Sequence, residues 1–158
     1  MSKTPLTVVG ADKLRTELHE LKTAQRPAVI AAIAEARAHG DLSENAEYAA
    51  AKERQSFIEG RIAEVESKLS NAQIINPALI DADGGCVFGA TIKLEDMNNR
   101  EVVTYQIVGD DEADIKQGKI SISSPIARAL IGRHEGDVAE VKAPGGTREY
   151  EILDVKYI

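Results

Sequence analysis

The chain has 158 residues, 43% of them hydrophobic, which suffices for one ordinary domain or two small ones. With a net charge of −7, it lacks the broad basic face of proteins that grip bare nucleic acid, so any such contact must be local. A single cysteine excludes an internal disulfide and a cysteine-based zinc cluster, and the three histidines are scattered. Without a bilayer-length apolar run or a signal peptide, the chain is expected to be cytoplasmic, with no membrane partner.

The first predicted element is a long helix that begins near Ala11. Its apolar residues recur at helical spacing in two sets: Leu14, Leu18 and Leu21, then Val29, Ile33 and Ala36. Pro27 lies between the two sets. Because proline lacks an N–H and its ring crowds the preceding turn, we expect a bend or a break there.

A second helix is predicted beyond a short polar connection. Its apolar seam alternates three and four residues, as in a coiled coil: Tyr48, Ala51, Gln55, Ile58, Ile62, Val65 and Leu69. In the connection, Gly40 suits a left-handed helix end, and Asp41 or Ser43 could begin the next helix. So short a link forces the helices antiparallel. Helices of about 27 residues, at ~1.5 Å per residue, make an arm of roughly 40 Å.

After Pro77 the pattern changes to short strand-like runs separated by turns, which predicts a compact α+β domain. We therefore divide the chain into a hairpin, residues 1–75, and a second domain, residues 76–158. The expected strands are 87–94, 102–108, 120–123, 138–143 and 149–157. A capped helix is expected over 124–131. The last strand changes its inward face between Ile152 and Leu153, which predicts a β-bulge there.

Two acids, Asp41 and Glu44, lie three residues apart at the predicted tip. Spacing alone favours a capping box, in which both carboxylates serve only backbone N–H groups. Their place at the end of an exposed rod favours a second interpretation. Two carboxylates there would hold Mg²⁺ weakly, as half of a metal site that a partner with further carboxylates could complete.

Charged residues elsewhere have simpler explanations. Arg37 and Lys52 lie on either side of the acids along the hairpin, and each alone reads as solvated surface charge. Together they could hold an RNA phosphate beside the tip. The acid-rich run 110–114 lacks the spacing and the glycine of a calcium loop, so we expect a solvated loop.

Several stretches together resemble the GreA family of transcription elongation factors (Gre-type transcript cleavage factors) over essentially the whole chain. They are Ile30 to Arg37, His39 to Leu42, Glu44 to Tyr48, Leu69 to Gln73, Ile107 to Asp114 and Ser124 to Arg128. The resemblance implies an N-terminal antiparallel coiled-coil hairpin followed by a C-terminal α+β domain similar to FK506-binding proteins (FKBP-like).

The resemblance also implies a mechanism. The hairpin would enter the secondary channel of bacterial RNA polymerase and meet the nascent RNA 3′ end that backtracking extrudes there. Asp41 and Glu44 would help position a Mg²⁺ shared with the polymerase, whose own active site then cuts the RNA. The chain would thus be no enzyme, hold no cofactor of its own and act as a monomer.

Further residues follow from the same resemblance. Arg37 and Lys52 occupy the positions of the family's small basic patch, which contacts RNA. The scarcity of basic residues favours the GreA type over the GreB type. Ser123, Ser124 and Pro125 would dock on the polymerase.

Three rivals remain open at this point. A regulator that occupies the channel without stimulating cleavage is disfavoured by the intact Asp41 and Glu44. A peptidyl-prolyl isomerase would need an aromatic-lined pocket, and the second domain holds only Phe88, Tyr105, Tyr150 and Tyr157. A purely structural coiled coil leaves the attached domain without a purpose.

Overall fold

The computed structural model describes residues 3–41 and 44–158, and the chain forms two compact units. One unit is Ala11–Ala72. The other joins the start of the chain, up to Gly10, with Gln73–Ile158. Residues from the two ends of the chain therefore build one unit, whereas the sequence was divided only once, after residue 75.

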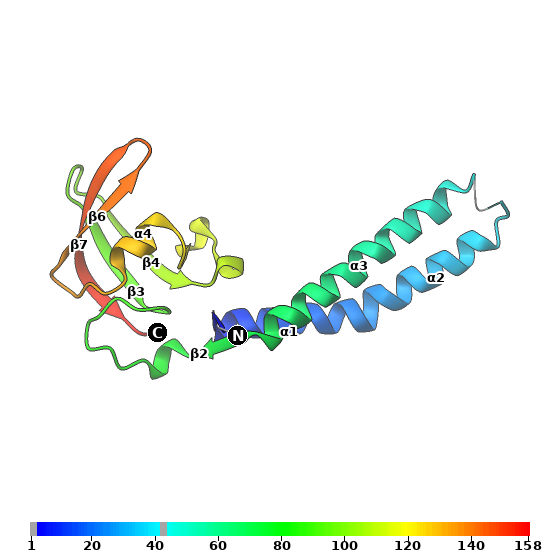
Figure 1. The fold of residues 1–158 in the computed structure, drawn as a ribbon, viewed down its shortest axis with the longest axis horizontal. Helices are drawn as coiled ribbons and strands as arrows, with labels where there is room; N and C mark the ends of the chain where they lie inside the picture. Colours follow the sequence, from blue (N-terminus) through cyan, green and yellow to red (C-terminus); the bar gives the residue numbers. More distant parts are fainter. Residues whose placement is uncertain (1–2, 42–43) are drawn as a thin grey trace. The chain divides into compact units, whose positions relative to one another are not determined.

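The unit Ala11–Ala72 is a helical hairpin (Figure 1). Its first arm comprises α1 (Val8–Glu20), a π-helical segment η1 (Leu21–Gln25) and α2 (Arg26–Arg37). Its second arm is α3 (Ala46–Ser70), which lies beside α2. In the described residues, no helix is both long enough and apolar enough to cross a membrane.

The predicted seam is the buried stripe of the hairpin. Leu21, Val29, Ile58 and Ile62 are all nearly inaccessible to solvent and form one apolar cluster, with Leu18 packed against it. Gln55, the polar member of the seam, is half-buried. The heptad spacing read from the sequence is thereby confirmed.

Ion pairs flank this stripe and confirm the antiparallel direction. Arg26 Nη2 lies 2.7 Å from Glu59 Oε1. Lys22 Nζ, which comes earlier in the chain, lies 3.1 Å from Glu66 Oε2, which comes later. Such exposed pairs contribute little to stability, so they chiefly fix the register of the two arms.

Pro27 neither breaks the first arm nor stops its helical path. The preceding segment η1 widens into a π-helix, in which the N–H of Arg26 donates to the carbonyl of Leu21. Pro27 then occupies the first turn of α2, where its missing N–H costs least.

A short two-stranded sheet that the sequence did not predict adjoins the hairpin. Strand β1 (Thr4–Thr7) directly precedes α1, and β2 (Ala72–Ile75) follows α3. The two strands pair with each other. The chain thus enters and leaves the hairpin through one ribbon.

The second unit contains a five-stranded sheet in the order β5-β4-β3-β7-β6. Its strands, in chain order, are β3 (Thr91–Asp96), β4 (Val102–Val108), β5 (Lys119–Ser121), β6 (Val138–Ala143) and β7 (Gly146–Lys156). Only the β4–β5 pair is parallel. The helix α4 (Pro125–Leu130) and the 3-10 segments η2 (Pro77–Leu79), η3 (Asp110–Glu112) and η4 (Ile115–Gln117) complete the unit.

The strand predictions are mostly confirmed, with one clear error. Residues 87–90 were expected to begin a strand but form a turn, because Gly89 has a φ of +89° and Ala90 N donates to Val87 O at 3.1 Å. The predicted bulge is confirmed. Lys93 pairs with Asp154 and Leu94 pairs with Ile152, which leaves Leu153 as the extra residue.

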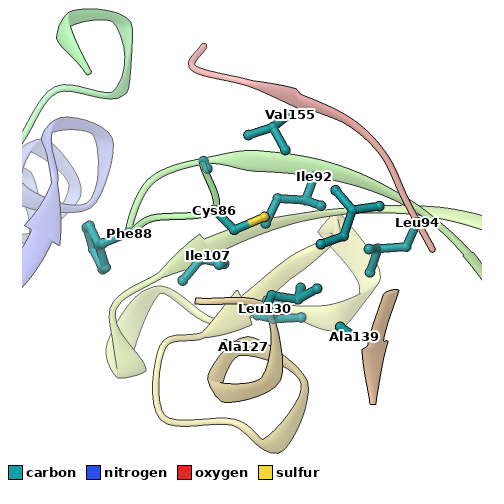
Figure 2. Packing of buried hydrophobic residues seen from close by; sticks show 12 residues of the cluster. Cys86, Phe88, Ile92, Leu94, Ile107, Ala127, Leu130, Ala139 and Val155 are labelled. Carbon is teal, nitrogen blue, oxygen red and sulfur yellow. The ribbon is translucent and has the colours of Figure 1, made fainter. Parts of the chain in front are cut away.

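The core of this unit lies between the sheet and α4 (Figure 2). Ile92, Leu94 and Ile107 from the sheet and Leu130 from α4 are each 0% exposed. Cys86 is buried with them, and burial raises the pKa of its thiol to about 11, which keeps it protonated and unreactive at neutral pH.

The acid-rich run 110–114 is largely exposed to solvent, as expected from the sequence, but hydrogen bonds hold it in place. Asp110 accepts hydrogen bonds from the hydroxyls of Ser121 and Ser123, the latter at 2.6 Å. These bonds hold the pKa of Asp110 below its ordinary value. Asp114 Oδ1 accepts from Lys116 N at 3.1 Å and begins η4. The run is a set of structural acceptors.

Candidate functional site

The first arm ends as the sequence predicted. Beyond Arg37, His39 N donates to Ala36 O at 3.1 Å and Gly40 N donates to Arg37 O at 3.4 Å. Gly40 has a φ of +112°, a conformation that side chains with a Cβ rarely adopt. The glycine thus lets the chain leave the helix and turn back.

The second arm begins later than expected, and a residue other than the predicted Asp41 or Ser43 begins it. Asn45 is the N-cap of α3, and its Oδ1 accepts from Tyr48 N at 3.0 Å. Its Nδ2 donates to Ala36 O, in the last turn of α2, at 2.6 Å. One amide therefore ties the two helix ends together. Asparagine is among the best N-capping residues, a signal that could have identified it.

The cap of α3 is thus supplied by neither of the tip acids. Asp41 and Glu44 are exposed, and both precede the N-cap of α3 instead of lying in its first turn. The expected Ser43 start lies outside the described residues. The role of α3 cap that the capping-box interpretation gave to Asp41 belongs to Asn45.

The basic residues predicted beside the acids are arranged around Tyr48. The guanidinium carbon of Arg37 lies 5.9 Å from the centre of the Tyr48 ring, within the range of a cation–π contact. Lys52 follows Tyr48 by one turn of α3, on the same side of the helix. Tyr48 is half-buried in the seam, so a packed side chain supports the Arg37 cation at the surface.

A further charged pair crosses the tip. His39 Nδ1 lies 3.6 Å from Glu47 Oε2, and both side chains are exposed. The pair joins the end of the first arm to the first turn of α3.

The tip alone does not form a complete metal site. Among residues 3–41 and 44–158, no three His, Cys, Asp or Glu side chains come together as a metal-binding group. Two exposed carboxylates fit a divalent ion in chemical type, since Mg²⁺ prefers oxygen ligands. They are too few to hold it without further ligands.

The three residues predicted to dock lie at the start of α4, and two of their side chains have internal partners. Ser124 is the N-cap of α4, and its Oγ accepts from Ala127 N at 3.2 Å. The Ser123 hydroxyl donates to Asp110, and Pro125 takes the first helical position. The structure therefore holds this loop firmly, whatever it contacts.

The aromatic residues of the second unit are used in packing. Phe88 is a buried member of the core, and Tyr105, Tyr150 and Tyr157 pack against it. Tyr157 also donates its hydroxyl to Gly85 O at 2.6 Å. Side chains engaged in this way are poorly suited to line an open proline pocket, which disfavours the isomerase.

Comparison with known families decides the assignment. The N-terminal model of the transcription elongation factors matches residues 4–74, and the C-terminal model of GreA/GreB transcription elongation factors matches residues 81–157. The chain belongs to the GreA/GreB family of transcription elongation factors. The family resemblance found in the sequence is thereby confirmed, as is a helical hairpin followed by a sheet-rich domain.

Relatives within the family match from end to end. Transcription elongation factor GreA of Ralstonia nicotianae is 70% identical over 158 residues, which is 100% of both chains. The GreA of Thioalkalivibrio sulfidiphilus is 69% identical over the same full length. Among solved structures, the GreA factor homolog 1 (Gfh1) of Thermus thermophilus is 28% identical and covers 97% of this chain and 98% of its own, with a TM-score of 0.44.

Proposed function

We propose that this elongation factor binds bacterial RNA polymerase and inserts its hairpin into the secondary channel. There it stimulates the polymerase's own Mg²⁺-dependent cleavage of the backtracked RNA 3′ end, so that arrested transcription resumes. The chain acts as a monomer in the cytoplasm and donates groups to an active site that it does not itself contain.

One observation carries this proposal: Asp41 and Glu44 are exposed at the end of a two-helix arm, and Asn45, not either acid, is the N-cap of its second helix. The arm is long enough to carry them away from any globular body, since the 25 residues of α3 span about 37 Å at ~1.5 Å per residue. Two exposed carboxylates at the end of such an arm are accessible to a metal ion held by a partner outside the chain.

The two acids would hold the shared Mg²⁺ together with carboxylates of the polymerase. When bound, such an ion supplies Lewis-acid stabilisation of the phosphodiester and a water of lowered pKa. Asp41 and Glu44 contribute negative charge and oxygen ligands, and they orient water near the RNA. They do not themselves bond to the substrate.

The neighbouring cations would hold the RNA. Arg37, supported on the Tyr48 ring, can contact a phosphate with two N–H groups in a fixed direction. Lys52 offers a more mobile charge, and its Nζ lies 3.3 Å from Gln55 Oε1. The family's docking role falls to Ser123, Ser124 and Pro125, on a loop that Asp110 and the cap of α4 keep in place.

The decisive experiment adds purified factor to stalled, backtracked elongation complexes in the presence of Mg²⁺. Wild type is expected to shorten the RNA, whereas Asp41→Asn and Glu44→Gln should each lower the cleavage rate by about 100-fold. Loss of a residue that only supports a metal ligand already lowers activity by up to about 100-fold. Glu53→Gln, an exposed acid farther along α3, is the charge-matched control and should cleave like wild type.

Binding must be measured beside cleavage. All four proteins should compete equally for polymerase, because the neutralised side chains lie outside the proposed docking loop. If Asp41→Asn and Glu44→Gln both cleave as fast as wild type, the tip acids do not act on the metal, and the channel-occupying regulator becomes the better account.

A further inference from the structure

The turn η3 contacts the start of the chain through a residue that has no part in the proposed function. Glu112, its last residue, places one carboxylate against the start of the chain. Its Oε2 accepts from Thr7 N at 3.1 Å and from Gly109 N at 2.9 Å, and its Oε1 accepts from the Thr7 hydroxyl. Thr7 is only 3% exposed and Glu112 is half-buried, so the carboxylate is a partly sheltered acceptor of three hydrogen bonds.

Thr7 links the Glu112 carboxylate to the start of α1. The residue immediately precedes Val8, the first residue of the helix, and its Oγ1 accepts from Gly10 N at 3.1 Å. That bond satisfies one of the N–H groups left without partners at a helix start. Because the Thr7 hydroxyl donates to Glu112 and accepts from Gly10, the carboxylate orients the cap.

Two glycines make room for the carboxylate. A Cβ at Gly10 would overlap the Glu112 carboxyl group. A Cβ at Gly109 would lie 3.1 Å from Glu112 Oε2 and 3.0 Å from Pro5 O. Neither glycine has a positive φ, so space alone requires them. The packing around the Glu112 carboxylate thus depends on the small size of Gly10 and Gly109 and on the hydroxyl of Thr7.

The same turn is fixed on its other side. Asp110, two residues before Glu112, accepts from the hydroxyls of Ser121, at the end of β5, and of Ser123, in the loop that leads into α4. This is the loop to which polymerase docking was assigned. A single three-residue turn therefore holds both the docking loop and the start of α1.

We propose that Glu112 is a positioning residue for transcript cleavage: through Thr7 it fixes the first turn of α1, and so sets where the arm that bears the tip acids begins. This inference rests on the proposed function of those acids. Helix α1 continues through η1 into α2 without a break, so the setting of its first turn is inherited by the residues that follow. A frayed start would leave Arg37 and Asp41 less exactly placed within the polymerase.

The test compares Glu112→Ala with the pair Thr7→Val and Thr7→Ser in the full-length chain. Valine keeps the shape of threonine but removes the hydroxyl, whereas serine keeps the hydroxyl. Cleavage of backtracked RNA is measured over a range of factor concentrations. Maximal rate and half-saturating concentration are thereby separated.

Glu112→Ala and Thr7→Val should lower the maximal rate by roughly 10- to 100-fold, because a misplacement of about 1 Å can cost on the order of 100-fold. The half-saturating concentration of Thr7→Val should change by less than about twofold, since Thr7 lies outside the turn that holds the docking loop. Thr7→Ser should retain the wild-type rate. Hydrogen exchange should quicken at the amides of Gly10 and Gly109 in Glu112→Ala.

Glu140→Ala, an exposed acid on β6, controls for lost charge, and thermal melting identifies any variant that does not fold. The inference is overturned if Thr7→Val folds and cleaves at the wild-type maximal rate, or if Thr7→Ser is as slow as Thr7→Val. Failure of the proposed function would look different. In that case wild type itself would not stimulate cleavage, or Asp41→Asn would cleave as fast as wild type.

Discussion

The two units of this factor keep their shapes by different means. The sheet-rich unit encloses a core in which Ile92, Leu94 and Leu130 are completely buried. The hairpin has no such interior, because each arm buries one stripe and exposes the rest. Exposed ion pairs, such as Arg26 with Glu59, border that stripe.

The difference explains where function can lie. A hairpin held by one seam exposes its outer faces and its end, and Asp41 and Glu44, to which we assign the metal chemistry, lie on this exposed end. The sheet-rich unit uses even its polar side chains to hold its loops, as Ser124 and Glu112 do. Its proposed docking loop is accordingly held by internal hydrogen bonds, whereas Asp41 and Glu44 are exposed and precede the N-cap of α3.

The largest effect should come from opening the core of the sheet-rich unit. Ile92→Ala removes a side chain that is 0% exposed, and we expect a loss of about 2–5 kcal/mol in the free energy of unfolding. Chemical denaturation measures the loss, and hydrogen exchange locates it. Amides of β3 and β7 should lose protection while those of α3 keep theirs. Equal losses in both units would contradict the division drawn here.

A smaller effect is expected where the arms meet at the tip. Asn45→Ala removes the N-cap of α3 and the bond to Ala36 O, at a cost of roughly 0.5–2 kcal/mol. Asn45→Asp is the matched control, because its carboxylate still accepts from Tyr48 N but cannot donate to Ala36. Thermal melting should rank aspartate between wild type and alanine. An alanine variant as stable as wild type would show that the seam alone closes the hairpin.

Ion pairs along the hairpin should matter less, and in a pH-dependent way. A hydrogen bond from Arg61 is the main cause that lowers the pKa of Glu17 from its ordinary 4.5. The pair, 2.7 Å between Nη2 and Oε1, therefore stabilises the folded state above that value and loses its effect as pH falls through the lowered pKa. Arg61→Gln should cost about 0.2–1 kcal/mol at pH 7, since the carboxylate is partly exposed.

Denaturation of both proteins over a pH series checks this sign. The difference in unfolding free energy between wild type and Arg61→Gln should shrink as pH is lowered below 4.5. A difference that stays constant, or grows in acid, would show that Arg61 acts through the packing of its aliphatic stem instead.

The smallest effect on stability should accompany one of the largest effects on activity. Glu44→Gln should change the free energy of unfolding by less than about 0.5 kcal/mol, because the side chain is exposed and lies before the N-cap of α3. The same protein should lose transcript cleavage. A substantial loss of stability would mean that Glu44 supports the hairpin and would weaken the contrast between the units.

Patterns with a local cause could be predicted from the sequence. Helical spacing identified the seam, alternation identified 102–108 and 138–143, and a switch of face identified the bulge at Leu153. The exposed place of Asp41 and Glu44 also followed from the spacing of the two helices. Each of these features depends on residues that are close together along the chain.

Features that join distant residues could not be predicted in this way. The β1–β2 ribbon pairs two four-residue strands, one before and one after the hairpin in the sequence. In addition, β1 contains Pro5, a residue type that argues against a strand. Glu112 and Thr7 are 105 positions apart. The cap of α3 was missed for another reason: Asp41, Ser43 and Asn45 all offer capping chemistry, and only the path of the chain selects Asn45.

The π-helical segment η1 has a consequence for how the first arm tolerates change in length. Leu21 and Val29 are both buried, at 3% and 2% exposed, although eight residues of α-helix would turn them about 80° apart at 3.6 residues per turn. The wider turn absorbs one residue and brings the two rows back into phase. Within η1 the arm can therefore lose a residue without a frameshift of the rows farther along, and a deletion elsewhere in the helix has no such reserve.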